Sequence, residues 1–367
     1  MSVLQSNHLD TNRESAHRDR LNARLSHVIG IHFDPDLGTP YWLDRERELG
    51  CDARKEIRDI ADLSILGEMT QHDIADRPLI DFIPRRFHDQ MHRFIIAQTG
   101  GTTGDGVWTA YLDHEFAQAF IIPFVVSAKH VGFPTCAQWL FVGPSGPHII
   151  GKVVRGLANA MESADPFTID FDPGWARKLP PESFAHTRYL AHITDQAMRI
   201  INTQCIGVLF TTPVVIESLG EQMTKTQRLM IRGIHLGGMQ VQRDQLAKVY
   251  ALFPNALILA GYGNTLMGCC LELDVDPKRT CFNYYPFGDR LILDVVDQIG
   301  DSVPSGEEGV VRLTRLDESF LIVHLRERDQ AQRVEPTPNA PEGYAGIGVR
   351  NPHPPKANGS QPVGGLY

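Results

Sequence analysis

The chain has 367 residues, a length typical of about two domains, and its 42% hydrophobic and 22% charged residues are those of a globular protein. Asp and Glu number 44 against 35 Lys and Arg, so the net charge of −9 excludes the basic field of a nucleic-acid-binding protein. From the polar first ten residues we expect no secretory signal, and no apolar run approaches the length of a membrane span. Six cysteines without C-x-x-C spacing indicate reduced thiols in a cytoplasmic protein without a structural metal.

Residues 1–90 predict an N-terminal helical arm or lobe that packs on the core, because residues 53–69 carry apolar side chains at helical spacing. From about residue 90 to 277, strand-like and helical segments alternate, which predicts an α/β core with parallel strands covered by helices. The predicted strands are 93–98, 137–142, 167–171, 206–210, 230–236 and 256–260, and the predicted helices are 113–131, 148–161, 182–203, 212–223 and 240–253. In such sheets ligands bind at the carboxyl ends of the strands.

The pattern changes after residue 278. Short apolar runs separated by Gly, Pro and Asp predict an antiparallel β-rich section of the same unit over residues 278–333, with strands at 281–285, 291–296, 310–313 and 320–325. From Val334 the sequence is rich in Pro and Gly, and we expect an irregular tail over residues 334–367.

The strongest local motif is Thr99-Gly100-Gly101-Thr102-Thr103-Gly104, followed by Asp105-Gly106. Closely spaced glycines let backbone N–H groups converge on an anion, and threonine hydroxyls add donors, so the loop suits phosphate oxygens. A flexible hairpin turn explains the same composition. The loop is not a Walker A motif, which needs a lysine, nor a G-x-G-x-x-G fingerprint.

Three further motifs follow predicted strands. Gly261-Tyr262-Gly263-Asn264-Thr265 begins like a dinucleotide fingerprint but has the wrong spacing, and a tight turn explains it equally well. Gly237-Gly238 marks either a binding turn or close helix–strand packing. In Arg326-Glu327-Arg328-Asp329 a carboxylate suits the two hydroxyls of a ribose, whereas the usual interpretation of such a run is a salt-bridged surface loop.

Taken in order, these motifs resemble those of the acyl-adenylate-forming superfamily, which includes acyl-CoA synthetases, adenylation domains and luciferases. Residues 99–104 resemble its phosphate loop, residues 262–265 its Tyr-Gly-x-Thr motif, and residues 306–311 its Gly-Glu-x-Gly-Glu-Leu-Val hairpin. Residues 326–329 resemble the ribose motif in its phenylacetate-CoA ligase version. Over about residues 90–330 the resemblance implies the family's large N-terminal domain, with two helix-covered, mostly parallel sheets and a smaller antiparallel section.

The sequence departs from this family at three places. Asp105-Gly106 stands where the phosphate loop usually continues to Pro-Lys, and Leu266 replaces the acidic residue that binds magnesium in the family. We expect no C-terminal lid domain, because only one lysine, Lys356, follows residue 330. In length and motif pattern the chain resembles the stand-alone adenylation-like proteins of phenazine antibiotic biosynthesis, in the griseoluteic acid branch.

The resemblance implies an ATP or AMP site, with Mg²⁺ carried by ATP, and an acyl pocket. Thr102 and Thr265 would act on the reacting phosphates. The implied nucleotide-binding residues are Thr99, Gly100, Gly101, Thr102, Thr103, Gly104, Gly237, Gly238, Gly261, Tyr262, Gly263, Asn264, Thr265 and Asp329. The acyl pocket would involve Trp139, Phe141, Gly143, Phe210 and Thr211, whose aromatic side chains would stack on a flat acid or simply form core.

These expectations favour ATP-dependent adenylation of an aromatic carboxylic acid, such as a phenazine carboxylate, with the acyl-adenylate passed to a downstream enzyme. Two alternatives remain at this stage: a catalytically weak scaffold that binds a nucleotide or an aromatic acid, and a nicotinamide-dependent oxidoreductase that uses the turn at Gly261. The sequence is compatible with a homodimer, and it predicts neither nucleic acid nor a membrane as a partner.

Overall fold

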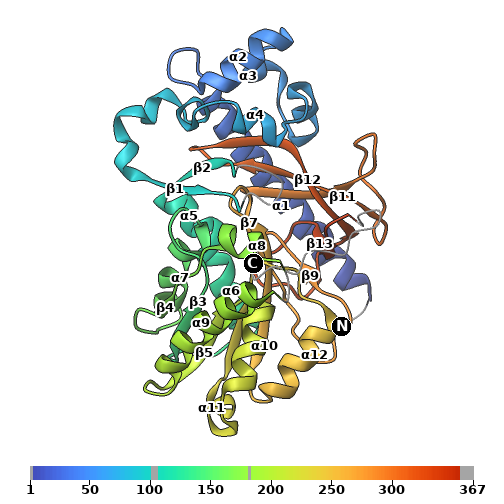
Figure 1. Cartoon of the computed structure of the whole chain (residues 1–367). Coiled ribbons are helices and arrows are strands. Elements are labelled where there is room, and N and C mark those ends of the chain that lie inside the picture. The colour runs from blue at the N-terminus through green and yellow to red at the C-terminus, as the bar shows by residue number, and fades with distance from the viewer. Residues whose placement is uncertain (1–2, 101–105, 181–182, 356–367) are drawn as a thin grey trace.

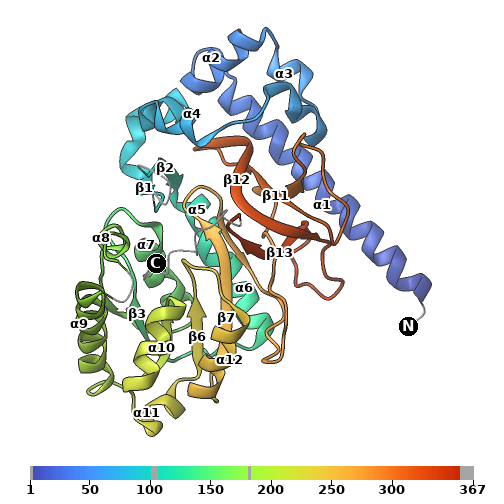
Figure 2. The same ribbon diagram turned by 45° about the vertical axis from the view of Figure 1, so that its right-hand side comes forward.

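The computed structural model describes residues 3–100, 106–180 and 183–355. Helices dominate up to residue 93 (Figure 1). They are α1 (Val3–His32), α2 (Pro40–Leu49), α3 (Ala53–Glu56) and α4 (Gln71–Ala75), with 3-10 turns η1 (Ile60–Leu66), η2 (Leu79–Phe82) and η3 (Arg85–Arg93). The long helix α1 runs beside the antiparallel sheet (Figure 2).

A six-stranded mixed sheet forms the centre of the α/β part, as the alternating pattern predicted. Its order is β4 (Phe167–Ile169), β3 (Gln138–Val142), β5 (Ile206–Thr211), β6 (Gly233–Leu236), β7 (Leu257–Asn264) and β8 (Gly268–Leu271). The first five strands are parallel, and β8 is antiparallel to β7. The predicted α/β class is confirmed. We expected two mostly parallel sheets, and all parallel strand pairs of the described residues belong to this one.

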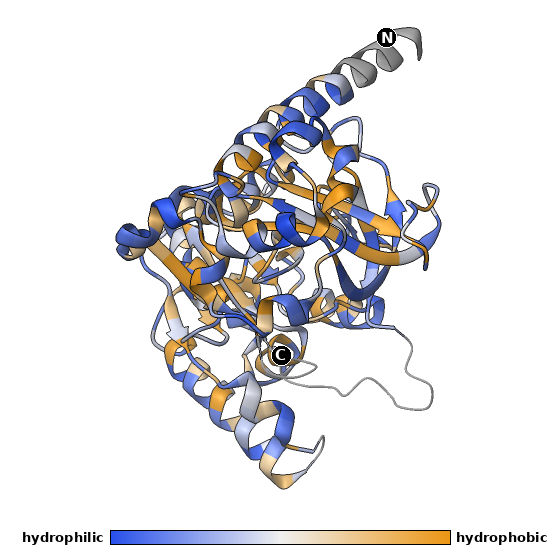
Figure 3. Ribbon diagram, turned by 90° about the horizontal axis from the view of Figure 1, so that it is seen from above, coloured by the Kyte–Doolittle hydropathy of each residue, from blue (hydrophilic) through white to orange (hydrophobic). Residues whose placement is uncertain are grey.

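Helices cover both faces of the mixed sheet because its strands are apolar on both faces. One face packs against a continuous helical stretch, α5 (Asp113–Phe116), the π-turn η4 (Ala117–Ile121) and α6 (Ile122–Val131), and against α7 (Ile149–Ala160). The other face packs against α9 (Phe184–Ile201), α10 (Pro213–Gln222) and α12 (Arg243–Leu252). The short helices α8 (Pro173–Lys178) and α11 (Lys225–Met230) complete this part. In Figure 3 the apolar colour concentrates on the strands.

A five-stranded antiparallel sheet follows, in the order β10 (Leu291–Val296), β11 (Glu308–Leu316), β12 (Leu321–Val334), β13 (Gly348–His353) and β9 (Asn283–Tyr284). This confirms the predicted antiparallel section. Strand β13 lies within the tail that we expected to be irregular, and it pairs with both β12 and β9. The composition of the tail hid this strand, because Pro352 and Gly348 stand at or near its ends.

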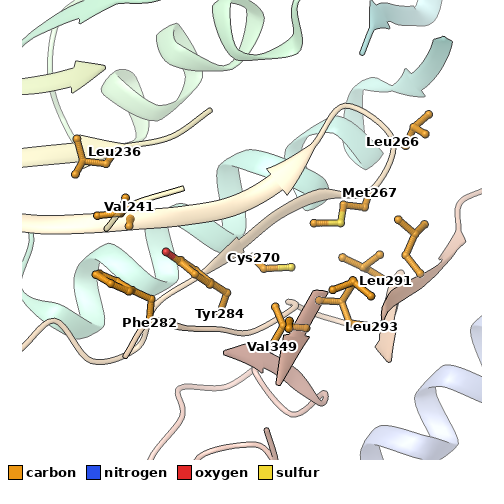
Figure 4. Packing of buried hydrophobic residues seen from close by; sticks show 14 of the residues in the cluster. Leu236, Val241, Leu266, Met267, Cys270, Phe282, Tyr284, Leu291, Leu293 and Val349 are labelled. Carbon is orange, nitrogen blue, oxygen red and sulfur yellow. The ribbon is translucent and has the colours of Figure 1, made fainter. Parts of the chain in front are cut away.

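The mixed and antiparallel sheets share one hydrophobic core. Leu266, Met267 and Cys270, at the β7–β8 hairpin, pack with Leu291 and Leu293 of β10 and with neighbouring side chains (Figure 4). A buried ionic cluster adds to this junction, since Asp317 accepts hydrogen bonds from Arg290 and Arg315. The carboxylate of Asp317 has no exposed surface. Arg290 also donates to Met267 O at 2.7 Å, which ties the cluster to the β7–β8 hairpin.

One sequence prediction about the junction is wrong. We expected the strand at 256–260 to end in a turn at Gly261–Gly263, but β7 continues through these glycines to Asn264 and folds back into β8. The close pairing of β7 with β8 requires glycine at position 263, because a side chain there would collide with the backbone of Gly268. None of the helices among the described residues combines the length and apolar character needed to cross a membrane.

Candidate functional site

The glycine/threonine loop connects the two strands of an antiparallel hairpin, β1 (Phe94–Gln98) and β2 (Trp108–Leu112). Its base is closed by hydrogen bonds: Thr99 N donates to Val107 O at 2.9 Å, and Val107 N donates to Thr99 Oγ1 at 3.0 Å. The Gln98 amide donates to Gly106 O at 2.9 Å. The predicted residues Gly101, Thr102, Thr103 and Gly104 lie outside the described residues.

The turn after β7 lies against this loop base. Thr265 Oγ1 donates to Gln98 O at 3.2 Å, and Tyr111 of β2 donates from its hydroxyl to Thr265 O at 2.7 Å. Thr265 is buried. Two motifs that are more than 160 residues apart in the chain therefore meet.

Strand β12 brings the third motif to the same place. The Tyr262 hydroxyl donates to Asp329 Oδ2 at 3.3 Å, and Asn264 Nδ2 donates to Glu327 Oε1 at 2.8 Å. Side chains at alternate positions of a strand lie on the same face. Tyr262 and Asn264 of β7 therefore both point toward β12, where they bond to Asp329 and Glu327. Asn264 Oδ1 accepts from the backbone N–H groups of residues 266 and 267, which fixes the turn.

Burial changes the proton affinity of these polar groups. Removal from water raises the pKa of Glu327 to about 7, and the hydrogen bond from Asn264 partly opposes this rise. Burial also raises the pKa of Asp329, while Arg328 and the Tyr262 hydroxyl lower it. The pKa of Tyr262 is raised well above its usual value by burial and by Asp329, so Tyr262 stays a hydrogen-bond donor at neutral pH. Two neighbouring carboxyl groups with raised pKa values are typical of functional sites.

Gly237 and Gly238 follow β6, the neighbour of β7. Gly238 has φ of +78°, a conformation that favours glycine. A β-carbon at Gly237 would lie 3.5 Å from the Phe210 ring, and one at Gly261 would lie 3.4 Å from the His235 ring. The backbones of Gly237 and Gly261 therefore lie directly against the rings of Phe210 and His235.

The aromatic residues of the predicted acyl pocket share one face of the sheet but form closed core in this structure. Trp139, Phe141 and Phe210 have relative exposures of 0%, 2% and 2%. The rings of Phe141 and Phe210 are 5.1 Å apart, and a side chain at Gly143 would collide with Phe141. Thr211 Oγ1 donates to Val142 O at 2.7 Å. Of the two interpretations of these aromatic residues, stacking on a flat acid or packing in the core, the structure shows packing in the core. A ligand would reach them only if the rings moved.

His235 is a polar member of this aromatic face that the sequence analysis missed. Its Nδ1 lies 2.9 Å from Leu259 O, and burial lowers the pKa of His235 to about 4, so the ring is neutral and donates from Nδ1. Its Nε2 has no hydrogen-bond partner among the described residues. Its ring packs 4.4 Å from Phe210 and 4.8 Å from Phe124. Residues 210 and 235 pair in neighbouring strands. The alternation of side chains along these strands could therefore have placed His235 on the same face as Phe210.

The site offers little to a protein-bound metal. Among the residues that the structure describes, no group of three or more His, Cys, Asp or Glu side chains is arranged to hold an ion. Leu266, at the position where the resemblance expects an acid, is fully buried in the hydrophobic core.

Solved structures reveal what fold this arrangement belongs to. Neither a protein-family model nor a curated protein matches the sequence. The structure of 2-hydroxyisobutyryl-CoA ligase in complex with 2-HIB-AMP and CoA is similar over 92% of this chain and 67% of the ligase, with a TM-score of 0.67 and 13% identity. The fold is that of the large domain of acyl-CoA ligases. The same ligase in its postadenylation state with 2-HIB-AMP gives a TM-score of 0.65, and an open conformation gives 0.63.

A likeness at 13% identity establishes this ligase-type fold and leaves the activity to the residues of the site. Three of the four segments that resemble the superfamily in sequence lie together in this fold, with contacts at Gln98, Tyr262–Thr265 and Glu327–Asp329.

Proposed function

We propose that this chain binds ATP and activates an aromatic carboxylic acid by adenylation. The observation that carries the proposal is the contact between three separate motifs, in which Thr265 bonds to the base of the glycine loop and Tyr262 bonds to Asp329. The sequence resemblance favours a phenazine carboxylate, in antibiotic biosynthesis, as the acid. The 2-hydroxyisobutyryl-CoA ligase structures with 2-HIB-AMP support an acyl-adenylate as the product class.

In this reaction a carboxylate oxygen of the acid attacks the α-phosphorus of ATP, the bond from that phosphorus to the bridging oxygen breaks, and pyrophosphate leaves. The protein contributes position and charge stabilisation. Asp329 would bind the ribose hydroxyls, Tyr262 would flank the adenine, and Gly237-Gly238 would line its other side. Thr265 and Thr102 would donate to phosphate oxygens, with the rest of the glycine loop around the terminal phosphates.

Mg²⁺ would arrive with ATP and be held by phosphates and water, because Leu266 cannot bind it. A lost charge-stabilising contact costs about 2.7–4 kcal/mol, or roughly 10²–10³ in rate, so we expect slow adenylation. An acyl-adenylate is a reactive mixed anhydride, and we propose that a downstream enzyme consumes it. The six cysteines are free, in agreement with a cytoplasmic location, and a homodimer remains part of the proposal.

A catalytically weak scaffold that binds a nucleotide or an aromatic acid is the second candidate. The observation that favours it is the closed packing of Trp139, Phe141 and Phe210, which leaves the aromatic face without exposed surface. A scaffold would bind AMP and yet fail to exchange pyrophosphate. The nicotinamide-dependent alternative has lost its basis, since Gly261 lies inside β7 rather than in a turn at the end of a strand.

ATP–pyrophosphate exchange, measured with a panel of phenazine, benzoic and aliphatic acids, tests adenylation. We expect exchange that depends on an aromatic acid, and its loss in Thr265→Ala and Asp329→Ala. Glu308→Ala, which removes an exposed carboxylate from β11, should exchange like the wild type. AMP binding without exchange for any acid would favour the scaffold, and absence of both would refute a nucleotide site.

A further inference from the structure

Helix α8 places an arginine at the Gly100 end of the glycine loop. Arg177 Nη2 donates a hydrogen bond to Gly100 O, and a β-carbon at Gly100 would lie 3.7 Å from Arg177 Nη1. The helix is fixed at its start by Pro173 and by Asp172, whose carboxylate accepts from Trp175 N at 3.0 Å. The guanidinium is therefore held against the loop backbone by a short, capped helix.

Arg177 has no carboxylate partner in an ion pair among the described residues. Its Nη1 is buried and has no hydrogen-bond partner, and none of the ion pairs in the described part of the chain includes it. Asp170 accepts a hydrogen bond from Ser145 N at 2.7 Å and Asp172 one from Trp175 N at 3.0 Å, and neither forms an ion pair with Arg177. A buried donor on a cation that lacks a partner is costly, and an anionic ligand would remove that cost.

His148 also lies on this side of the loop, where residues 98 and 148 form a parallel bridge. Burial, and secondarily the charge of Arg177, lower the pKa of His148, while Asp172 and Asp170 raise it. His148 is therefore neutral at pH 7, and Arg177 supplies the positive charge at Gly100.

We propose that Arg177 binds the terminal phosphates of ATP, as the cation that a glycine loop without a lysine otherwise lacks. A guanidinium suits this role because its planar fork donates two hydrogen bonds to phosphate oxygens. Nη2 is engaged by Gly100 O, which leaves Nη1 as the donor without a partner. The inference rests on the proposed function for the identity of ATP, but the anion site itself is defined by Arg177 and Gly100.

Calorimetric titration with pyrophosphate, ATP and AMP separates the two proposals. The variants are Arg177→Gln, Arg177→Lys and the matched control Lys178→Gln, which removes one exposed positive charge from the next position of α8. Hydrogen bonds to charged groups predict that Arg177→Gln weakens pyrophosphate and ATP binding about 10- to 100-fold, and AMP binding less than about threefold. Arg177→Lys should fall between, and Lys178→Gln should match the wild type.

Equal losses for ATP and AMP in Arg177→Gln would overturn the inference, because they would show a general loop-supporting role. Unchanged pyrophosphate and ATP affinities would overturn it as well, as would a wild type that binds neither. A wild type that binds pyrophosphate through Arg177, but neither ATP nor AMP, would uphold the anion site and refute the nucleotide function. The thermal midpoint of each variant shows that the loss is not caused by unfolding.

Discussion

Glu327→Gln is predicted to stabilise the protein in a pH-dependent way. Glu327 is 9% exposed, and its Oε1 accepts a 2.8 Å hydrogen bond from Asn264 Nδ2. Glutamine keeps an acceptor oxygen at this place and nearly the same volume, but it cannot ionise. The substitution therefore removes the cost of a buried carboxylate without removing the contact between β7 and β12.

The magnitude follows from the difference in pKa between the two states. Burial raises the pKa of Glu327 from 4.5 to about 7 in the folded protein. The stability contributed by the protonated side chain is complete below about pH 4.5 and is lost as the pH rises through 7. At about 1.4 kcal/mol per pH unit, ionisation costs the wild type up to about 3 kcal/mol at pH 8.5 and about 1 kcal/mol at pH 5.

Urea unfolding at pH 5 and pH 8.5 measures this difference. We expect the advantage of Glu327→Gln over the wild type to grow by about 2 kcal/mol between the two pH values. Comparison with the wild type cancels other groups such as Glu272, whose pKa burial also raises to about 7. Glu308→Gln, at an exposed position, should show no such growth. An advantage that is equal at both pH values, or a destabilised variant at pH 8.5, would refute the reasoning.

Three further predictions concern the ribose, the metal and the ionic cluster. Asp329→Ala should weaken AMP binding by about 1.5–3 kcal/mol in calorimetry, and an unchanged affinity would refute the ribose assignment. Magnesium titration of the nucleotide-free protein should show no tight one-to-one binding, because Leu266 offers no ligand. Asp317→Asn should lower the free energy of unfolding by about 3–5 kcal/mol, because it leaves Arg290 and Arg315 uncompensated, whereas Asp289→Asn, at a partly exposed pair with Arg24, should cost at most about 1 kcal/mol. Equal effects of these two substitutions on urea unfolding would contradict the account of the cluster.

The sequence was most informative where apolar runs had the length of a strand or a helix. The runs at 137–142, 206–210 and 291–296 match β3, β5 and β10 within two residues. The first two belong to the parallel sheet, whose strands are buried on both faces and need continuous apolar side chains. The composition of residues 99–106 revealed the glycine loop, for which the sequence offered two interpretations, a phosphate-binding loop and a hairpin turn. The structure places the loop between the strands of the β1–β2 hairpin.

The features that the sequence could not supply depend on contacts between distant segments. Gly261 and Gly263 suggested a turn, yet pairing with β8 keeps them extended. The Pro/Gly-rich tail hid β13, which is stabilised by its neighbours β12 and β9 rather than by local propensity. Arg177 reaches Gly100 across 77 residues, so no local motif could reveal it.

Single-turnover product analysis tests the central claim most directly. The protein would be mixed in excess over ATP labelled at the α-phosphate, with Mg²⁺ and an aromatic acid, and quenched over seconds to hours. The account predicts slow, acid-dependent formation of acyl-AMP together with one equivalent of pyrophosphate, abolished in Thr265→Ala. Formation of ADP and phosphate would contradict attack at the α-phosphorus, and bound but unconsumed ATP with every acid tested would contradict adenylation itself.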